Sequence, residues 1–331
     1  MVNGGGTLYA RAAVVATPGA LHGRRFLPNL GDRIFRLVLL VISVGVIALL
    51  FAITWKIIDG ARLAYDEFGL GFVTDRNWDP VTNSFGALDL IYGTAVTSFF
   101  ALLVAVPLSI AIALFLTELA PQTVRDVVGA LIEMLAAIPS VVLGLWGILV
   151  LGPFIHSTLG PFVQKLFGWL PLFKGDPQAS SVFTASVILT IMVVPIIASI
   201  TRELLSNVPG ELKDGALALG TTRWEMLRGV VLPYVRGGIV AAVVLGFGRA
   251  IGEAIAVTQV IGGQLGIHAS LFRPGDTLAS RIAAQYQGAS SNMQISALVY
   301  LAAILLVISL VINIGAQLIV SRFEQAKTGG S

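Results

Sequence analysis

Six long apolar segments dominate the sequence and limit what the chain can fold into. They cover residues 34–58, 90–119, 127–151, 182–201, 231–262 and 295–320. Each is long enough to cross a bilayer as a helix, which takes about 20 residues. A helix also satisfies its own backbone hydrogen-bonding groups, which lipid cannot do. Only 12% of the 331 residues are charged, against about 25% in a typical soluble protein. The sequence therefore predicts an all-α integral membrane protein whose six transmembrane helices occupy residues 34–320.

Charged residues between the segments predict how the chain is oriented. The N-terminal tail, residues 1–33, is rich in glycine and arginine, whereas segment 59–89 has more acidic than basic residues. Lys and Arg favour the cytoplasmic side of a membrane. We therefore expect a cytoplasmic tail and an external loop at 59–89. Alternation across six helices then makes loop 202–230 and the C-terminal tail, residues 321–331, cytoplasmic, so that both termini lie on that side.

Arg249 and Glu253 are two charged residues inside the fifth apolar segment. An arginine near the middle of a membrane helix costs roughly 2.5–3.5 kcal/mol by insertion scales, so it is rarely kept without a use. A spacing of four residues predicts that both side chains lie on one face of a helix, about one turn apart. The pair therefore predicts a polar spot that faces protein or a water-filled path. Two interpretations stay open from the residues alone, a contact for an anionic substrate and a structural ion pair.

Motifs for ATP binding or catalysis are absent from the sequence. It contains no GxxxxGK[ST] phosphate-binding loop and no cysteine, and its three histidines lie far apart. No nucleophile elbow or HExxH metal motif is present, so an intrinsic catalytic activity has no candidate site. The formal net charge of +3 gives no indication of nucleic-acid binding. These absences favour transport, driven either by an ion gradient or by another subunit.

The predicted cytoplasmic loop, 202–230, has the pattern of a short helix-turn-helix. A Pro-Gly pair predicts the end of the fourth membrane helix. Residues 211–219 then have the composition of a helix, and Gly220 suits its C-terminus. Thr222 and Glu225 are spaced as a capping box that opens a further helix. The many small and apolar residues of this loop favour a surface for another protein over a solvated linker.

The same loop carries a motif with a specific spacing. Asp-Gly-Ala is followed after three residues by a glycine, and after nine more by Val-Val-Leu-Pro. This resembles the EAA loop of ABC importer permeases, EAA-x3-G-x9-I-x-LP. The residues that carry the ATPase-coupling function in this resemblance are Asp214, Gly215, Ala216, Gly220, Leu232 and Pro233. Asp214 replaces the family's Glu and Gly215 its first Ala, which loosens the helix by up to about 1 kcal/mol. The resemblance implies a coupling helix that docks into a groove on an ATPase subunit.

Three further segments resemble the permease subunits of phosphate ABC importers, PstC type. They read NWDPVTNSFGALDLIYGTAVTS, EMLAAIPSVVLGLWG and GFGRAIGEAIAVTQVIGG. The resemblance covers the chain from about residue 30 onwards. It implies the type I ABC importer permease fold, the plasma membrane of a prokaryote, and a non-catalytic subunit that forms half of a phosphate path. The implied partners are a second permease (PstA type), an ATPase dimer (PstB type) and an external phosphate-binding protein (PstS type). ATP and Mg would be bound by the ATPase, and this chain would need no cofactor or metal.

The resemblance also implies a role for Arg249 and Glu253 in phosphate passage. A guanidinium stays charged and presents a fork of donors that matches phosphate oxygens. Glu253 would compete for that fork and keep binding weak enough for release. Two alternative functions stay open. One is an ABC permease for another oxyanion, sulfate or molybdate. The other is an ion-coupled secondary transporter, for which only Glu253 lies deep enough to serve as an ion site.

Overall fold

The computed structural model describes residues 30–328, with side chains described for 31–318. The tail predicted for residues 1–33 therefore lies almost entirely outside the described residues. The helices are α1 (Leu30–Phe68), α2 (Gly71–Thr74), α3 (Leu88–Leu114), α4 (Gln122–Ala137), α5 (Ser140–Trp146), α6 (Gly152–Phe154), α7 (Gly160–Phe167), α8 (Val182–Ser206), α9 (Gly210–Ala218), α10 (Arg223–Met226), α11 (Leu232–Gly252), α12 (Ile255–Val260), α13 (Leu278–Gln285) and α14 (Asn292–Thr328).

Short irregular elements connect these helices. The strands β1 (Trp78–Asp79) and β2 (Ser84–Phe85) form an antiparallel hairpin in which Trp78 pairs with Phe85. Wider π-helical turns extend or join several helices: η1 (Phe115–Leu119), η2 (Gly147–Leu151), η3 (Ile155–Leu159) and η5 (Leu227–Val231). Two 3₁₀ turns are η4 (Pro171–Phe173) and η6 (Tyr286–Gly288). The chain divides into two compact units, Met1–Ile53 and Thr54–Ser331. The described part of the first is helical, and the second contains the helix bundle.

Six helical stretches of the described residues are long and apolar enough to cross a bilayer, which confirms the predicted number of spans. They are Gly31–Phe68, Leu88–Leu119, Ser140–Phe167, Val182–Ser206, Arg223–Gly252 and Asn292–Leu318. The first helix runs to Phe68 and the last to Thr328, beyond the predicted limits at 58 and 320. Hydropathy marks where a helix leaves the apolar layer, whereas charged residues with good helix propensity can continue the helix outside it.

The predicted third segment, 127–151, is interrupted near its middle. Ile138 is extended, with ψ 127°, because Pro139 disfavours the helical conformation in the residue before it. The chain on both sides of this break nevertheless follows α8. Gly129 of α4 lies against the guanidinium of Arg202 near the end of α8, and α5 contacts α8 further along. The helical stretch that is long and apolar enough to cross a bilayer begins after this break, at Ser140, and runs to Phe167, so the predicted limits 127–151 are wrong at both ends.

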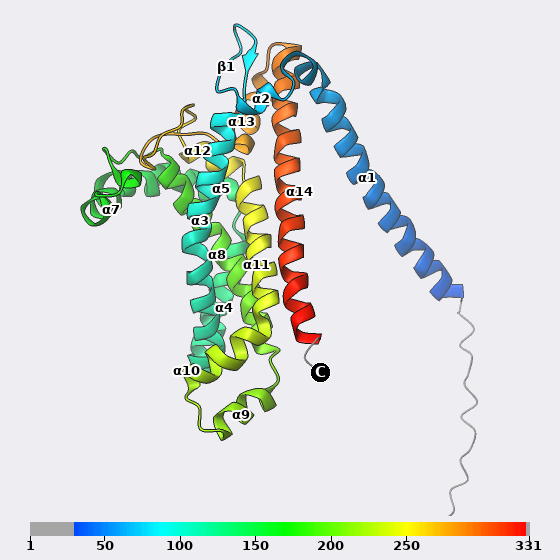
Figure 1. The fold of residues 1–331 in the computed structure, drawn as a ribbon, viewed down its shortest axis with the longest axis vertical. Coiled ribbons are helices and arrows are strands. Elements are labelled where there is room, and N and C mark those ends of the chain that lie inside the picture. The colour runs from blue at the N-terminus through cyan, green and yellow to red at the C-terminus, as the bar shows by residue number, and fades with distance from the viewer. Residues whose placement is uncertain (1–29, 329–331) are drawn as a thin grey trace, which may run out of the picture. The chain divides into compact units, whose positions relative to one another are not determined.

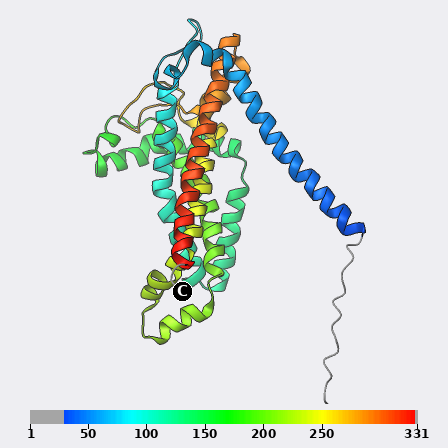
Figure 2. The ribbon, with the colours of Figure 1, turned by 45° about the vertical axis from the view of Figure 1, so that its right-hand side comes forward.

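α8 is the central helix of the bundle. In its most apolar stretch 61% of the residues are buried, against 28% to 33% for the other spans of the second unit. α3 and α11 pack along α8, and α14 packs along α11 (Figures 1 and 2). At one end of the bundle, the hairpin end, Phe72, Phe85 and Leu278 form a buried cluster. At the other, the α9 end, Ala216 and Val231 belong to a second cluster.

Candidate functional site

Arg249 and Glu253 lie at a break in the fifth span. α11 ends at Gly252, the backbone of Glu253 is extended (φ −73°, ψ 113°), and a helix resumes as α12 at Ile255. Arg249 is in the last turn of α11 with an exposed side chain, where its charge complements the negative end of the helix dipole. Glu253 is buried, with only 9% of its surface exposed. The two side chains therefore have different surroundings.

The prediction that Arg249 and Glu253 share one face of a continuous helix is wrong. The Glu253 carboxylate accepts a hydrogen bond from the backbone N–H of Ala256, with 3.3 Å between Oε1 and N. It thereby satisfies one of the free N–H groups at the start of α12 and lies at the positive end of that helix. Gly252 weakens α11 at the same point. The ion pairs of the described residues do not include one between Arg249 and Glu253.

The geometry of the break is suited to binding an anion. Within the described part of the chain, no hydrogen bond or ion pair holds the Arg249 guanidinium. Broken helices inside a span are the usual place for substrate sites in transporters, since their ends present unpaired backbone groups. Packing holds α12 in place: Val257 and Val260 are buried in a core cluster, and Gly144 of α5 lies against Ala256. A packed half-helix, α12, thus begins only a few residues after the exposed arginine.

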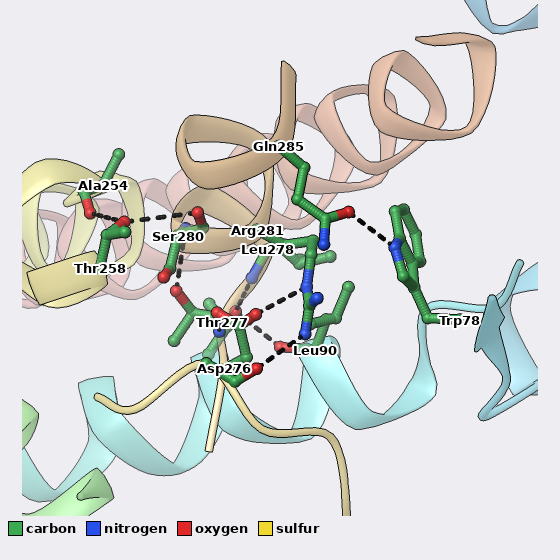
Figure 3. A network of polar contacts seen from close by, with 12 residues as sticks. Trp78, Leu90, Ala254, Thr258, Asp276, Thr277, Leu278, Ser280, Arg281 and Gln285 are labelled. Atoms are coloured by element: carbon green, nitrogen blue, oxygen red, sulfur yellow. Dashed lines mark hydrogen bonds and ion pairs between the residues drawn. The ribbon is translucent and has the colours of Figure 1, made fainter. Parts of the chain in front are cut away.

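A buried polar network fixes the chain that follows α12 (Figure 3). At its centre the Nε of Arg281 lies 2.6 Å from Oδ2 of Asp276, with the two side chains 9% and 3% exposed. The other carboxylate oxygen accepts a 2.8 Å hydrogen bond from the Thr277 N–H. Burial raises the pKa of the Asp276 carboxyl, and the Arg281 guanidinium opposes that shift. The guanidinium also lies over the Trp78 ring, 5.8 Å from its centroid.

The same network ties α13 to three neighbouring elements. The bonds run from Leu278 N to Thr94 Oγ1 of α3 (3.0 Å), from Thr258 Oγ1 of α12 to Ser280 O (3.3 Å), and from Trp78 Nε1 of β1 to Gln285 Oε1 (2.8 Å). This region lies between the fifth and sixth predicted membrane helices, and the network was not predicted from the sequence. The available signal was the spacing of Thr277 and Ser280, because the Thr277 hydroxyl caps α13 by accepting the Ser280 N–H.

The loop with the EAA-like motif forms the predicted helix-turn-helix. α9 ends before Gly220, which has φ +85°, a conformation that favours glycine at a helix C-terminus. The predicted capping box is confirmed: the Thr222 hydroxyl accepts the Glu225 N–H at 3.3 Å, and the Glu225 carboxylate accepts the Thr222 N–H at 2.8 Å. α10 then continues through η5 into α11. α9 is thus held across the end of the bundle at a fixed distance from the fifth span.

Some of the six motif residues are exposed, and others pack against the bundle. Asp214 and Gly215 are exposed on α9, whereas Ala216 is buried with 8% exposure. At the start of α11, Leu232 is partly buried and Pro233 is exposed. Four large apolar side chains of the helix-turn-helix remain exposed in this chain, Leu212, Leu217, Leu219 and Trp224. The motif therefore places one α9 face on the bundle and leaves another available to a partner.

Two cationic side chains at the α9 end were not predicted. Lys213 of α9 forms an ion pair with Glu118 of η1, with 2.6 Å between Nζ and Oε1. Arg125 of α4 donates to the backbone oxygens of Leu116 (2.7 Å) and Thr117 (2.8 Å) in the same turn. Lys213 and Glu118 are 95 positions apart, and Arg125 reaches back across the turn between two helices, so the spacing within a single helix gave no signal for either contact.

The described residues contain no group of three or more His, Cys, Asp or Glu side chains that could hold a metal ion. The break in the fifth span offers a charged guanidinium, a capping carboxylate and the ends of two helices. Of these groups the guanidinium is the one suited to binding an anion, since the Glu253 carboxylate already caps the start of α12.

The chain is similar to known membrane transport proteins. The family described as binding-protein-dependent transport system inner membrane component matches residues 105–325. The phosphate transport system permease protein PstC of Mesorhizobium japonicum is 42% identical over 310 residues, which cover 92% of this chain and 94% of that protein. The PstC protein of Pasteurella multocida is 42% identical over 298 residues, covering 89% and 93%. PstC 1 of Mycobacterium tuberculosis is 41% identical over 268 residues, covering 78% and 79%.

Solved structures of ABC transporters share the fold. A bacterial alginate ABC transporter, in complex with its alginate pentasaccharide-bound periplasmic protein, matches with a TM-score of 0.57 at 18% identity, over 88% of this chain and 98% of that chain. A second structure, of a bacterial ABC transporter that imports alginate, matches with a TM-score of 0.51 at 18% identity, over 86% and 98%. At these identities the likeness concerns the fold alone. The predicted all-α membrane fold of the type I ABC importer permeases is confirmed.

Proposed function

The chain belongs to the family of binding-protein-dependent transport system inner membrane components, and we propose that it is the PstC-type permease subunit of an ATP-driven importer of inorganic phosphate. One observation carries this conclusion: 42% identity with a phosphate transport system permease over 92% of the chain. The subunit is a multi-pass membrane protein and is not itself an enzyme. It forms half of the translocation path, and ATP is hydrolysed by a separate subunit.

The partners of the subunit follow from the same assignment. A permease of this family works with an ATPase and a binding protein. The specific partners in our proposal are a PstA-type second permease, a PstB-type ATPase dimer and a PstS-type external phosphate-binding protein. ATP and Mg would be bound by the ATPase, so this chain requires no cofactor. The sequence supports this division of labour because it lacks a GxxxxGK[ST] loop.

The proposed orientation in the plasma membrane of a prokaryote places the α9 end in the cytoplasm and the hairpin end outside. Both termini would then be cytoplasmic. The support is the distribution of charge, since cytoplasmic loops of membrane proteins are enriched in Lys and Arg. The loop between α8 and α11 contains Lys213, Arg223 and Arg228. In this orientation the exposed face of α9 meets the ATPase, and the residues that would carry the contact include Asp214, Gly215 and the exposed leucines.

Arg249 is our proposed contact for phosphate in the translocation path. Its guanidinium is exposed and forms no hydrogen bond or ion pair with the described residues, and it offers paired donors to phosphate oxygens. Glu253 takes a different role from the one the sequence suggested. Its carboxylate holds the start of α12, so in this conformation it positions the half-helix beside the arginine. Phosphate-loaded binding protein and ATP would each favour one of two arrangements of the path.

The experiment that tests the function uses the complete transporter reconstituted in liposomes. It compares ATP turnover and uptake with phosphate-loaded and sulfate-loaded binding proteins, together with an ion gradient in the absence of ATP. We expect uptake of phosphate that depends on ATP. If only the sulfate-loaded binding protein stimulated ATP turnover, the assignment of phosphate as the substrate would be wrong, and another oxyanion would be favoured. Uptake driven by the ion gradient without ATP would overturn the ABC mechanism and favour a secondary transporter.

A further inference from the structure

The ion pair between Lys213 and Glu118 joins the helix that faces the ATPase to the end of a membrane helix. Nζ and Oε1 lie 2.6 Å apart, and the side chains are only 20% and 13% exposed. Lys213 belongs to α9, and Glu118 belongs to η1, which continues α3 without a break. A partly buried ion pair is weak evidence for stability, because the cost of desolvating the two charges offsets their attraction. The role of this contact therefore lies in the two elements that it links, α9 and α3.

The position of Glu118 is unfavourable without a cation. The C-terminus of a helix is negative, so a carboxylate in the last turn is repelled there. Arg125 neutralises part of that end by donating to the Leu116 and Thr117 carbonyl oxygens. Lys213 provides the charge that pairs with the carboxylate itself. The ion pair with Lys213 therefore accounts for a glutamate at the negative end of this helix.

Apolar packing between α9 and α3 is slight. Ala216, one turn beyond Lys213 on the same face of α9, is the buried α9 residue of the cluster at this end. A hollow of about 240 Å³ lies beside the ion pair and reaches Asp214 and Leu217 on α9 and Leu227 on η5. Because an alanine side chain buries little surface and the hollow leaves a gap, the ion pair is the directional contact between the two helices.

α3 connects this contact to the hairpin end. Its first turn holds Asp89, which is 7% exposed and pairs with Arg76 at 2.9 Å. Thr94 of α3 accepts the N–H of Leu278 in α13, so α3 is bonded to the polar network that follows the break. A displacement of the Glu118 end of α3 thus has a bonded route to the elements around α12.

We propose that the Lys213–Glu118 ion pair couples α9 to α3, so that movement of the ATPase-facing helix is passed to the hairpin end of the bundle. Lys213 and Glu118 are positioning residues in this inference, which rests on the proposed function. The ion pair remains closed through the transport cycle, and α9 and the Glu118 turn move as one body.

The first test uses the complete transporter in liposomes with Lys213→Met, Glu118→Gln and the charge-reversed double variant Lys213→Glu/Glu118→Lys. Allosteric coupling is typically worth a factor of about 5 to 150. We expect each single variant to assemble and to keep basal ATP hydrolysis. The amount of phosphate transported per ATP should fall by a factor of about five or more. The double variant should recover most of that ratio. Lys165→Met, at an exposed lysine of α7, is the matched control and should leave the ratio unchanged.

Two results would overturn the inference while leaving the proposed function intact. One is a wild-type transport ratio in an assembled Lys213→Met complex. The other is a double variant that assembles but performs no better than the single variants. A purely structural role would instead lower the assembly of the complex and the basal ATP hydrolysis together. Failure of the wild-type complex to import phosphate would contradict the proposed function itself.

A second test does not depend on the single variants folding well. The chain contains no cysteine, so Lys213→Cys/Glu118→Cys can be joined by a short thiol-specific cross-linker in a complex whose other subunits lack reactive thiols. The Cys pair lacks the ion pair and should transport less phosphate per ATP, as the single variants do. If α9 and η1 move as one body, cross-linking raises this ratio towards the wild-type value, and cleaving the link lowers it again. A ratio that stays low or falls further on cross-linking would overturn the inference, because it would show that a fixed link between the two residues does not carry the coupling.

Discussion

Asp276 and Arg281 form an ion pair that is almost closed to solvent, with 2.6 Å between Oδ2 and Nε. The pair lies where α3, α12, α13 and the hairpin meet. Replacing Asp276 by Asn should therefore leave a buried guanidinium without its counter-charge. Removing one member of a buried pair typically costs about 3–5 kcal/mol. We expect a clear fall in the thermal unfolding temperature of the assembled transporter in detergent.

Asp79→Asn is the matched control for Asp276→Asn. Asp79 is the last residue of β1 and is partly exposed, and its hydrogen bonds are local ones from the Val81 N–H and the Thr82 hydroxyl. The unfolding temperature of this variant should match that of the wild type. Equal shifts for the two variants would mean that the Asp276–Arg281 pair contributes no more than a surface carboxylate.

Gly93 gives a test of close packing between α3 and the same network. A Cβ at this position would overlap the backbone oxygen of Asp276, which cannot move away as a flexible side chain would. Overpacking of this kind costs about 1–3 kcal/mol, so Gly93→Ala should lower the unfolding temperature of the assembled transporter. Gly45→Ala in α1 is the control, because no atom lies within 4 Å of a Cβ there. It should be neutral or stabilise α1 by up to about 1 kcal/mol.

Arg249→Gln tests the proposed phosphate contact. Hydrogen bonds to charged groups are worth about 1.5–3 kcal/mol, so we expect phosphate uptake by the assembled transporter to fall by about tenfold or more. Arg249→Lys should recover only part of it, since an ammonium lacks the paired donor fork. The control is Arg62→Gln, which removes an exposed arginine paired with Asp59 on α1. Normal uptake by assembled Arg249→Gln would exclude the contact.

The separation of Arg249 and Glu253 can be measured independently of transport. Because the structure contains no ion pair between them, the effects of Arg249→Gln and Glu253→Gln on stability should add to within about 0.5 kcal/mol in the double variant. The measurement is a double-mutant cycle of unfolding free energies in detergent. A larger coupling energy would show that the two side chains do interact in the state that unfolds.

Leu219→Glu tests the α9 face that would meet the ATPase. Leu219 is 87% exposed next to the C-terminus of α9, and a buried charge without a partner is costly in an interface. We expect less ATPase to co-purify with this variant. Val81→Glu is the control at the hairpin end, where the side chain is 90% exposed, and should leave co-purification unchanged. Equal recovery of ATPase with both variants would exclude Leu219 from the contact.

Much of the fold was predictable because its signals are local. Stretches of about 20 apolar residues marked the membrane helices, and the Thr222–Glu225 spacing marked the start of the helix before the fifth span. The break at Glu253 was not predictable in the same way. A glutamate four residues after Arg249 suits a continuous helix equally well, and the choice depends on how Val257 and its neighbours pack.

The contacts that stabilise the candidate site were missed for a related reason. Leu278 bonds to Thr94, and Lys213 pairs with Glu118, across 184 and 95 positions of the chain respectively. The pattern of apolar and polar residues within one helix does not show which residue from a distant part of the chain will contact it. The residues of the EAA-like loop were identified because their spacing is a property of one continuous segment, and the structure adds which of them face outward.

The π-helical turn η1, Phe115–Leu119, implies an unusual tolerance of chain length. Such a turn holds an extra residue relative to the regular helix. Deleting one residue from it would restore the ordinary helical pitch, and the remaining residues would turn the chain through about the same angle as the wider turn did. The same deletion in the regular part of α3 would rotate everything that follows, Glu118 included, by about 100°. A one-residue deletion in η1 should therefore disturb the Lys213–Glu118 ion pair less than one in the regular part of α3.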